Sequence, residues 1–156
     1  MSVADNPDWG RSVETVACDR WPLNRVSSDD DVPDWIDART VDPIETELSP
    51  EPIVEAGTPV EVKACQRRYR GRNGRWWIKR GNHESLLAED GEYVLAVYDS
   101  NSGDVVRMSL LSARTLDALV TSWWDCGDGG RTAEEYRQIP WTAVFDNLAR
   151  PEGDRP

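Results

Sequence analysis

The sequence predicts an α/β fold in which a mixed central β-sheet is flanked by helices. Residues 12–21 place apolar side chains at helical spacing, and residues 58–65 alternate between apolar and polar side chains as a strand does. The segment YVLAVY at 93–98 is apolar on both faces, as in a strand at the centre of a sheet. Because helical and strand patterns alternate along the chain, the helices are expected to pack on the sheet.

The first half of the chain is expected to supply one helix and three strands. The helix covers 12–21, and a short strand covers 35–40. The strand at 58–65 comes next, and residues 75–80 continue the sheet. Residues 41–57, between the first two strands, contain three prolines and four glutamates, which indicates an exposed acidic insertion with little regular structure.

The second half is expected to supply two helices and three strands. A helix over 82–90, capped by Asn82, precedes the central strand at 93–98 and its hairpin partner at 105–111. A helix from Leu116 to Trp124 follows, with Trp123 and Trp124 in the core. An edge strand is expected at 139–145. Residues 1–150 are therefore expected to form one domain, followed by a disordered tail at 151–156.

The charge of the chain is strongly acidic. The net charge is −11, and only Lys63 and Lys79 among the 18 basic residues are lysines. An acidic surface repels phosphate groups, but this acid-rich and arginine-rich composition also resembles that of proteins from salt-loving archaea. We therefore interpret the acidity as a solubility adaptation of a haloarchaeal protein.

Location and redox state follow from what the sequence lacks. No apolar run approaches the length of a membrane span, and the N-terminus has neither the basic nor the apolar stretch of a secretory signal. Cys18, Cys65 and Cys126 are an odd number without CxxC spacing, which disfavours a disulfide framework and a zinc ribbon. A cytoplasmic protein with reduced thiols and no organic cofactor is expected.

The tripeptide Glu61-Val62-Lys63 is the most informative motif. Residues two apart on a strand point the same way, so a carboxylate and an ammonium lie side by side. This pair suits phosphodiester hydrolysis, because a carboxylate helps to hold Mg²⁺ and a lysine activates the attacking water or stabilises the growing negative charge. E-x-K also occurs by chance on exposed strands. A lysine kept in a chain that uses arginine almost everywhere else, together with an upstream aspartate, favours the catalytic interpretation.

The pattern resembles the PD-(D/E)XK, or restriction-endonuclease-like, nuclease superfamily, whose core pairs an aspartate on one strand with (D/E)xK on the next. The resemblance implies a restriction-endonuclease-like core with Asp37, Glu61 and Lys63 as catalytic residues. It also implies a Mg²⁺ or Mn²⁺ ion held by Asp37 and Glu61. Glu14 on the first helix resembles the additional metal-site carboxylate of many members, and Gln66 resembles a polar residue that some members place beside the scissile phosphate.

The identity of the aspartate has an alternative. A literal Pro-Asp pair, ending at Asp34, also precedes Glu61. Asp34 belongs to the end of a loop, whereas Asp37 lies within the expected strand. Asp37 is therefore favoured, and the acidic insertion accounts for its long separation from Glu61.

A basic segment begins directly after this strand. Residues 62–83 contain no acidic residue, so the rest of the chain holds all 29 acids. The side chains expected to bind a nucleic-acid backbone are Arg67, Arg68, Arg70, Arg72, Arg75, Lys79 and Arg80. Such clustering in an acidic chain is what a phosphate backbone requires, and a solvated hairpin whose arginines pair with acids elsewhere is the alternative.

Two tryptophans and the one histidine of the chain lie in this segment. Trp76 and Trp77 fall on opposite faces of the strand at 75–80, so one is expected in the core and the other towards the groove. Packing is the favoured role for both, and base stacking is the alternative. His83, the sole histidine, is interpreted as a capping or surface residue.

The favoured function is a Mg²⁺-dependent DNA nuclease of a restriction, repair or recombination kind. One alternative is a non-catalytic DNA-binding or interaction module that retains the nuclease fold. A second is a protein-interaction domain whose arginine loop binds an acidic partner. A homodimer is favoured if both DNA strands are cut, because one domain supplies one site.

Overall fold

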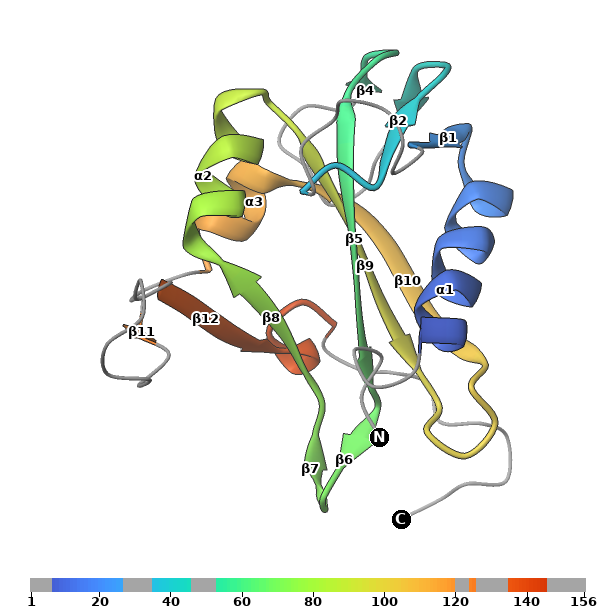
Figure 1. The fold of residues 1–156 in the computed structure, drawn as a ribbon, viewed down its shortest axis with the longest axis vertical. Coiled ribbons are helices and arrows are strands. Elements are labelled where there is room, and N and C mark those ends of the chain that lie inside the picture. The colour runs from blue at the N-terminus through green and yellow to red at the C-terminus, as the bar shows by residue number, and fades with distance from the viewer. Residues whose placement is uncertain (1–6, 27–34, 46–52, 120–123, 126–134, 146–156) are drawn as a thin grey trace.

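The computed structural model describes residues 7–26, 35–45, 53–119, 124–125 and 135–145. Its central feature is a five-stranded sheet with the strand order β1-β2-β5-β9-β10 (Figure 1). These strands are β1 (Leu23–Arg25), β2 (Ala38–Thr40), β5 (Pro59–Gln66), β9 (Glu92–Tyr98) and β10 (Val105–Ser112). The pair β5 and β9 is parallel and the other neighbours are antiparallel. The predicted fold class, a mixed sheet with helices, is confirmed.

The remaining elements surround this sheet. They are α1 (Pro7–Arg20), the pair β3 (Ile44–Glu45) and β4 (Ile53–Val54), the hairpin β6 (Arg68–Tyr69) and β7 (Arg72–Asn73), β8 (Arg75–Lys79), α2 (Arg80–Ala88), α3 (Ala113–Asp117), β11 (Trp124–Asp125), β12 (Glu135–Pro140) and a 3₁₀ turn (Trp141–Ala143). Figure 1 shows α1 on one side of the central sheet, with α2, α3, β8 and β12 on the other side.

The parallel pairing of β5 with β9 decides which side chains share a face. The register runs without a shift from Val60 opposite Glu92 to Gln66 opposite Tyr98. One face packs against α1 and contains Val60. The other face packs against α2, α3 and β8 and contains Tyr93. Strand alternation therefore places the odd-numbered residues of β5 on the face away from α1.

A second sheet covers the face away from α1. It has the order β11-β12-β8, and the indole N–H of Trp76 on β8 donates to the carbonyl of Ala96 on β9 at 2.9 Å. The expectation that residues 75–80 continue the central sheet is therefore wrong. Gly74 lies so close to the end of β5 that a Cβ there would stand 1.7 Å from the carbonyl oxygen of Gln66. The chain reverses at this point and crosses over the central sheet.

Several expected boundaries also differ. The helix expected up to Trp124 ends at Asp117, and Trp124 lies in β11, where the backbone pairs with Tyr136. The edge strand expected at 139–145 is β12, which ends at Pro140 before the 3₁₀ turn. Residue Lys79, not Asn82, is the N-cap of α2, and no side chain caps that end.

The acidic insertion is more regular than expected at its two ends. Ile44 and Val54 pair across β3 and β4, and both side chains are buried in the core on the α1 side. Burial of these two apolar side chains anchors the ends of the insertion. The tail expected at 151–156 lies outside the described residues. In the described part of the chain, no helix is long and apolar enough to cross a membrane.

Candidate active site

The centre of the site is an ion pair within β5. Glu61 and Lys63 point to the face away from α1, and Lys63 Nζ lies 2.8 Å from Glu61 Oε1. The Glu61 side chain is 5% exposed, whereas that of Lys63 is 25% exposed. A buried carboxylate is costly unless a cation or hydrogen bonds compensate its charge. The ammonium of Lys63 gives this compensation and also reaches the solvent.

Asp37 makes three hydrogen bonds with backbone groups, two of them on β5 and one on the residue that follows β1. Its N–H donates to the carbonyl of Val60 at 2.9 Å, and its carbonyl accepts from the N–H of Val26 at 3.0 Å. Its carboxylate Oδ2 accepts from the backbone N–H of Val62 at 2.7 Å. Because β2 begins only at Ala38, the aspartate side chain satisfies an amide that a longer β2 would have paired. Asp37 was expected within this strand and instead lies just before it.

This position gives the Asp37 carboxyl an unusual proton affinity. Burial raises the pKa of Asp37 to about 7, against the lowering effect of the Val62 N–H. The negative charges of Glu14 and Glu61 raise this pKa further, and the positive charge of Lys63 lowers it. Three carboxyl groups and one ammonium group therefore influence one another at this end of β5.

Glu14 approaches from the other face of the sheet. It lies on α1, and its Oε2 accepts a hydrogen bond from Arg25 Nη2 on β1 at 2.6 Å. Arg25 therefore offsets one of the clustered negative charges. The sequence reasoning missed Arg25, because nothing in the local sequence around it indicates which carboxylate it contacts.

Gln66 is not brought to this group. Alternation along β5 places it on the opposite face from Lys63, and its side chain is buried. Its Nε2 has no hydrogen-bond partner among the described residues. Asp34, the alternative aspartate, lies outside the described residues.

Residues 1–146 match a family described as the PD-(D/E)XK nuclease superfamily domain. The chain belongs to this superfamily. The resemblance predicted from Asp37, Glu61 and Lys63 is thereby confirmed at the level of the family. No curated protein and no solved structure matches the chain. Membership in the PD-(D/E)XK superfamily indicates a nuclease, and PD-(D/E)XK nucleases generally use divalent metal ions.

The side chains at the PD-(D/E)XK site fit a hard divalent cation. Asp37 and Glu61 offer carboxylate oxygens, which are the ligands that Mg²⁺ and Mn²⁺ prefer. Burial is the main cause of the raised pKa of Asp37, and the charges of Glu14 and Glu61 raise it further; a bound cation would offset both effects by stabilising the ionised carboxylate. Within the described ranges, no three or more His, Cys, Asp or Glu side chains are already grouped as metal ligands. Asp37 and Glu61 would offer such an ion two carboxylate ligands.

A buried hydrogen-bond chain lies on the same face as Glu61. Tyr93 is the register partner of Glu61, and its hydroxyl lies 2.8 Å from His83 Nδ1. His83 Nε2 lies 2.9 Å from Asp117 Oδ1. A carboxylate can only accept, so in the neutral imidazole Nε2 donates to Asp117 and Nδ1 accepts from the Tyr93 hydroxyl. Burial raises the pKa of Tyr93, and the charges of Glu61 and Asp117 add to this effect.

The expectation that His83 is a capping or surface residue is therefore wrong, because its side chain is 1% exposed. His83 comes from α2, Tyr93 from β9 and Asp117 from α3. The chain joins three separate elements behind Glu61, so no local spacing in the sequence could reveal it. It fixes the packing of both helices against the strand next to the catalytic motif.

The basic segment divides into four groups, the first of which is the β6–β7 hairpin. Arg70 (φ 51°) and Gly71 (φ 77°) form the left-handed turn of the β6–β7 hairpin, and the Arg70 guanidinium lies 5.3 Å from the Tyr69 ring centre. Arg68 donates within the hairpin to the Gly71 carbonyl at 2.6 Å. Arg70 and Arg72 are exposed.

The other basic side chains have different surroundings. Arg80 pairs with Glu84 at 2.8 Å and with Glu135, which fits the alternative in which arginines pair with acids elsewhere. Arg75 and Lys79 are exposed on one face of β8. Arg67 is half-buried, and its carbonyl accepts from the indole N–H of Trp141 at 2.9 Å.

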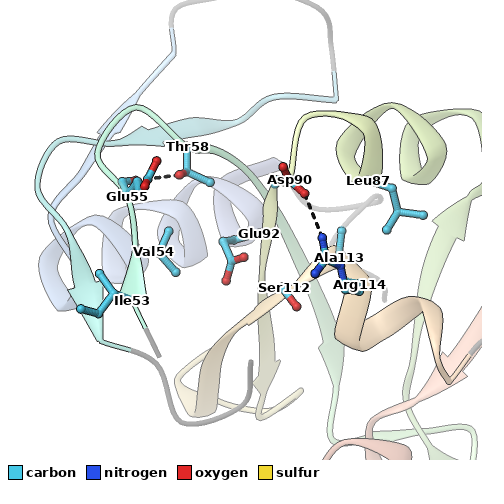
Figure 2. Close-up of a pocket in the computed structure, with 11 residues that line it drawn as sticks. Ile53, Val54, Glu55, Thr58, Leu87, Asp90, Glu92, Ser112, Ala113 and Arg114 are labelled. Atoms are coloured by element: carbon cyan, nitrogen blue, oxygen red, sulfur yellow. Dashed lines mark hydrogen bonds and ion pairs between the residues drawn. The ribbon is translucent and has the colours of Figure 1, made fainter. Parts of the chain in front are cut away.

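A separate hollow opens at the end of the sheet where β9 begins and β10 ends (Figure 2). Glu92 and Ser112 line it from these two strands, and an ion pair of 3.2 Å between Asp90 and Arg114 lies along one side. None of the residues expected to act in cleavage or DNA binding lines this hollow. It is therefore distinct from the group formed by Asp37, Glu61 and Lys63.

Proposed function

We propose that this protein is a divalent-metal-dependent DNA nuclease whose active site contains Asp37, Glu61 and Lys63. The observation that supports the proposal is the attachment of the Asp37 carboxylate to the Val62 N–H, between the two residues of the Glu61–Lys63 ion pair. Glu61 and Lys63 belong to β5, and the Asp37 carboxylate is hydrogen-bonded to it. Metal-assisted hydrolysis of a phosphodiester needs such a set of two carboxylates and one amine.

In this proposal the residues have distinct roles. Asp37 and Glu61 would hold the ion, which when bound supplies a Lewis acid for the phosphoryl oxygen and a water of lowered pKa. Lys63 reaches solvent beside Glu61, so its ammonium can orient the attacking water or stabilise negative charge on the phosphoryl oxygens. Glu14 is an accessory carboxylate, held by Arg25, that adds negative charge near Asp37.

The direct test is incubation of the purified protein with supercoiled plasmid and with short duplex DNA. We expect cleavage with Mg²⁺ or Mn²⁺ and none with EDTA, because the proposed chemistry needs an ion that supplies the Lewis acid and a water of lowered pKa. Assays at low and high potassium chloride test the haloarchaeal interpretation, which predicts activity at high salt. If the protein binds DNA but cleaves it with neither Mg²⁺ nor Mn²⁺, the non-catalytic DNA-binding module is supported instead.

The plasmid assay also tests the number of subunits. One chain supplies one such group, so we propose that cutting both strands requires two copies of the protein. Linear product that appears together with nicked product, and a rate that rises steeply with protein concentration, would support a dimer. Nicked circles as the sole product would indicate a monomer that cuts one strand.

The arginine hairpin is proposed to contact the DNA backbone. Exchanging Arg70 and Arg72 for glutamine should reduce the slope of log affinity against log salt by about 2, because each phosphate contact contributes about 0.9 to that slope. Affinity should fall about equally for all duplex sequences, since phosphate contacts carry no base information. Fluorescence anisotropy of a labelled duplex at several salt concentrations measures both effects.

The matched control is Arg80→Gln. This arginine already pairs with Glu84 and Glu135, so its removal should leave the salt dependence unchanged. An unchanged slope in the variant lacking Arg70 and Arg72 would mean that the hairpin does not contact DNA. The acidic protein partner would then become the favoured ligand of this hairpin.

A further inference from the structure

The second sheet has an outer face that neither the metal site nor the hairpin uses. Strand β8 alternates strictly, with Trp76 and Ile78 buried and with Arg75, Trp77 and Lys79 exposed. In the antiparallel register with β12, Gln138 lies opposite Trp77 and Tyr136 lies opposite Lys79. Register partners in a sheet point to the same side, so these residues share one face.

Two aromatic rings are stacked on this face. The ring centres of Trp77 and Tyr136 are 4.6 Å apart, and the ring planes differ by 9°. The Trp77 residue is nevertheless 54% exposed. A large ring left in solvent on a regular strand is unusual, because burial of such a side chain is strongly favourable. Its neighbours on β8 and β12 hold it in position without covering it.

The charge around the rings favours an anionic ligand. Arg75 and Lys79 are exposed and lie two residues before and after Trp77 on the same strand face. The carboxylate of Glu135 on β12 lies on the opposite face by alternation, where it pairs with Arg80. This part of the surface therefore combines stacking rings with positive charge in a chain of net charge −11.

We propose that this outer face binds single-stranded DNA, with a base stacked on Trp77 and the adjoining phosphates contacted by Arg75 and Lys79. Stacking onto aromatic side chains requires an open base face, which a paired base inside a duplex does not offer. Tyr136 is stacked on one face of the indole and limits its rotation, so the base would stack on the other face. The inference takes DNA as the partner from the proposed function, and it requires no cleavage.

The experiment uses the whole protein in EDTA, so that binding is measured without turnover. The probes are a labelled oligothymidine of about 12 nucleotides, an abasic strand of the same length and the corresponding duplex. Trp77→Leu should weaken binding of oligothymidine by about fivefold to a hundredfold, because each stacked base contributes about that much. Binding of the abasic strand and the duplex should change little. Trp77→Phe keeps a ring and should retain most of the affinity.

One further variant and one further measurement make the result decisive. Val41→Ala trims a side chain of similar exposure outside β8 and β12 and should bind all three probes as the wild type does. Circular dichroism and thermal unfolding of Trp77→Leu show whether the second sheet remains folded. The proposal is overturned if folded Trp77→Leu binds oligothymidine as tightly as the wild type, or if it loses all three probes equally. If the wild type cleaves no DNA with Mg²⁺ or Mn²⁺ but its binding of oligothymidine depends on Trp77, the nuclease proposal alone is contradicted.

Discussion

Glu61→Gln will lower the rate of metal-dependent DNA cleavage by about a thousandfold. The exchange keeps the size and burial of the side chain and removes the negative charge that the ion and Lys63 both require. Duplex affinity should stay near that of the wild type, because this side chain is buried beneath the surface that contacts DNA. Single-turnover cleavage and anisotropy with the same duplex measure the two quantities.

Two companion variants separate catalysis from stability. Lys63→Arg keeps a cation beside Glu61, so the fold should be retained, but the larger planar guanidinium cannot place its charge where the compact ammonium does, and cleavage should fall. Glu89→Gln makes the same chemical change on an exposed residue at the end of α2 and should cleave normally. Normal cleavage by Glu61→Gln would rule out the proposed mechanism.

Asp37→Asn will stabilise the metal-free protein while abolishing cleavage. The folded-state pKa of Asp37, about 7, is above its ordinary value of 3.8, so the folded protein binds this proton more tightly than the unfolded chain. Stability from this group is therefore complete below about pH 4, falls as the pH rises, and is lost above about pH 7. Asparagine is never charged and still offers an oxygen to the Val62 N–H.

The expected size follows from the shift in pKa. At about pH 8 the free energy of unfolding of Asp37→Asn should exceed that of the wild type by about 4 kcal/mol, since each pKa unit corresponds to about 1.4 kcal/mol. At about pH 4 the two proteins should be equal. Urea unfolding in EDTA at both pH values measures the difference. Equal free energies of unfolding at the higher pH would show that ionisation of the Asp37 carboxyl does not destabilise the folded protein.

Added Mg²⁺ gives an independent check on the same residue. An ion that binds the folded state raises the melting temperature, so the wild type should be stabilised above about pH 7. Asp37→Asn has lost one ligand and should show a much smaller response. A wild type that does not respond to Mg²⁺ or Mn²⁺ would indicate that Asp37 has a structural role in capping the Val62 amide.

The sequence predicted the features that depend on local alternation. The Glu61–Lys63 pair follows from strand period alone, and the structure contains it as an ion pair. The contact of Asp37 with Val62 could not be predicted, because it depends on where β2 separates from β5. The buried position of His83 depends on partners from two distant elements, Tyr93 and Asp117.

The second sheet shows the same limit of local patterns. The alternation of β8 correctly predicts that Trp76 and Trp77 lie on opposite faces, and the structure shows that Trp76 is the buried one and Trp77 the exposed one. The alternation does not reveal which strand pairs with β8, because a half-buried strand has the same pattern in the central sheet as in the second sheet. Helical spacing likewise continued past Asp117 in the sequence, although the chain changes to a strand by Trp124.

The pairing of β8 with β12 has a consequence for how the chain folds during synthesis. The inner side chains of β8, Trp76 and Ile78, share a core with Ile139, Trp141 and Phe145, which are made much later. Until those residues leave the ribosome, β8 has an unpaired edge and an uncovered apolar side, both of which promote association between chains. Pairing of β12 with β8 is therefore expected to limit association between nascent chains, and it also brings Tyr136 to Trp77.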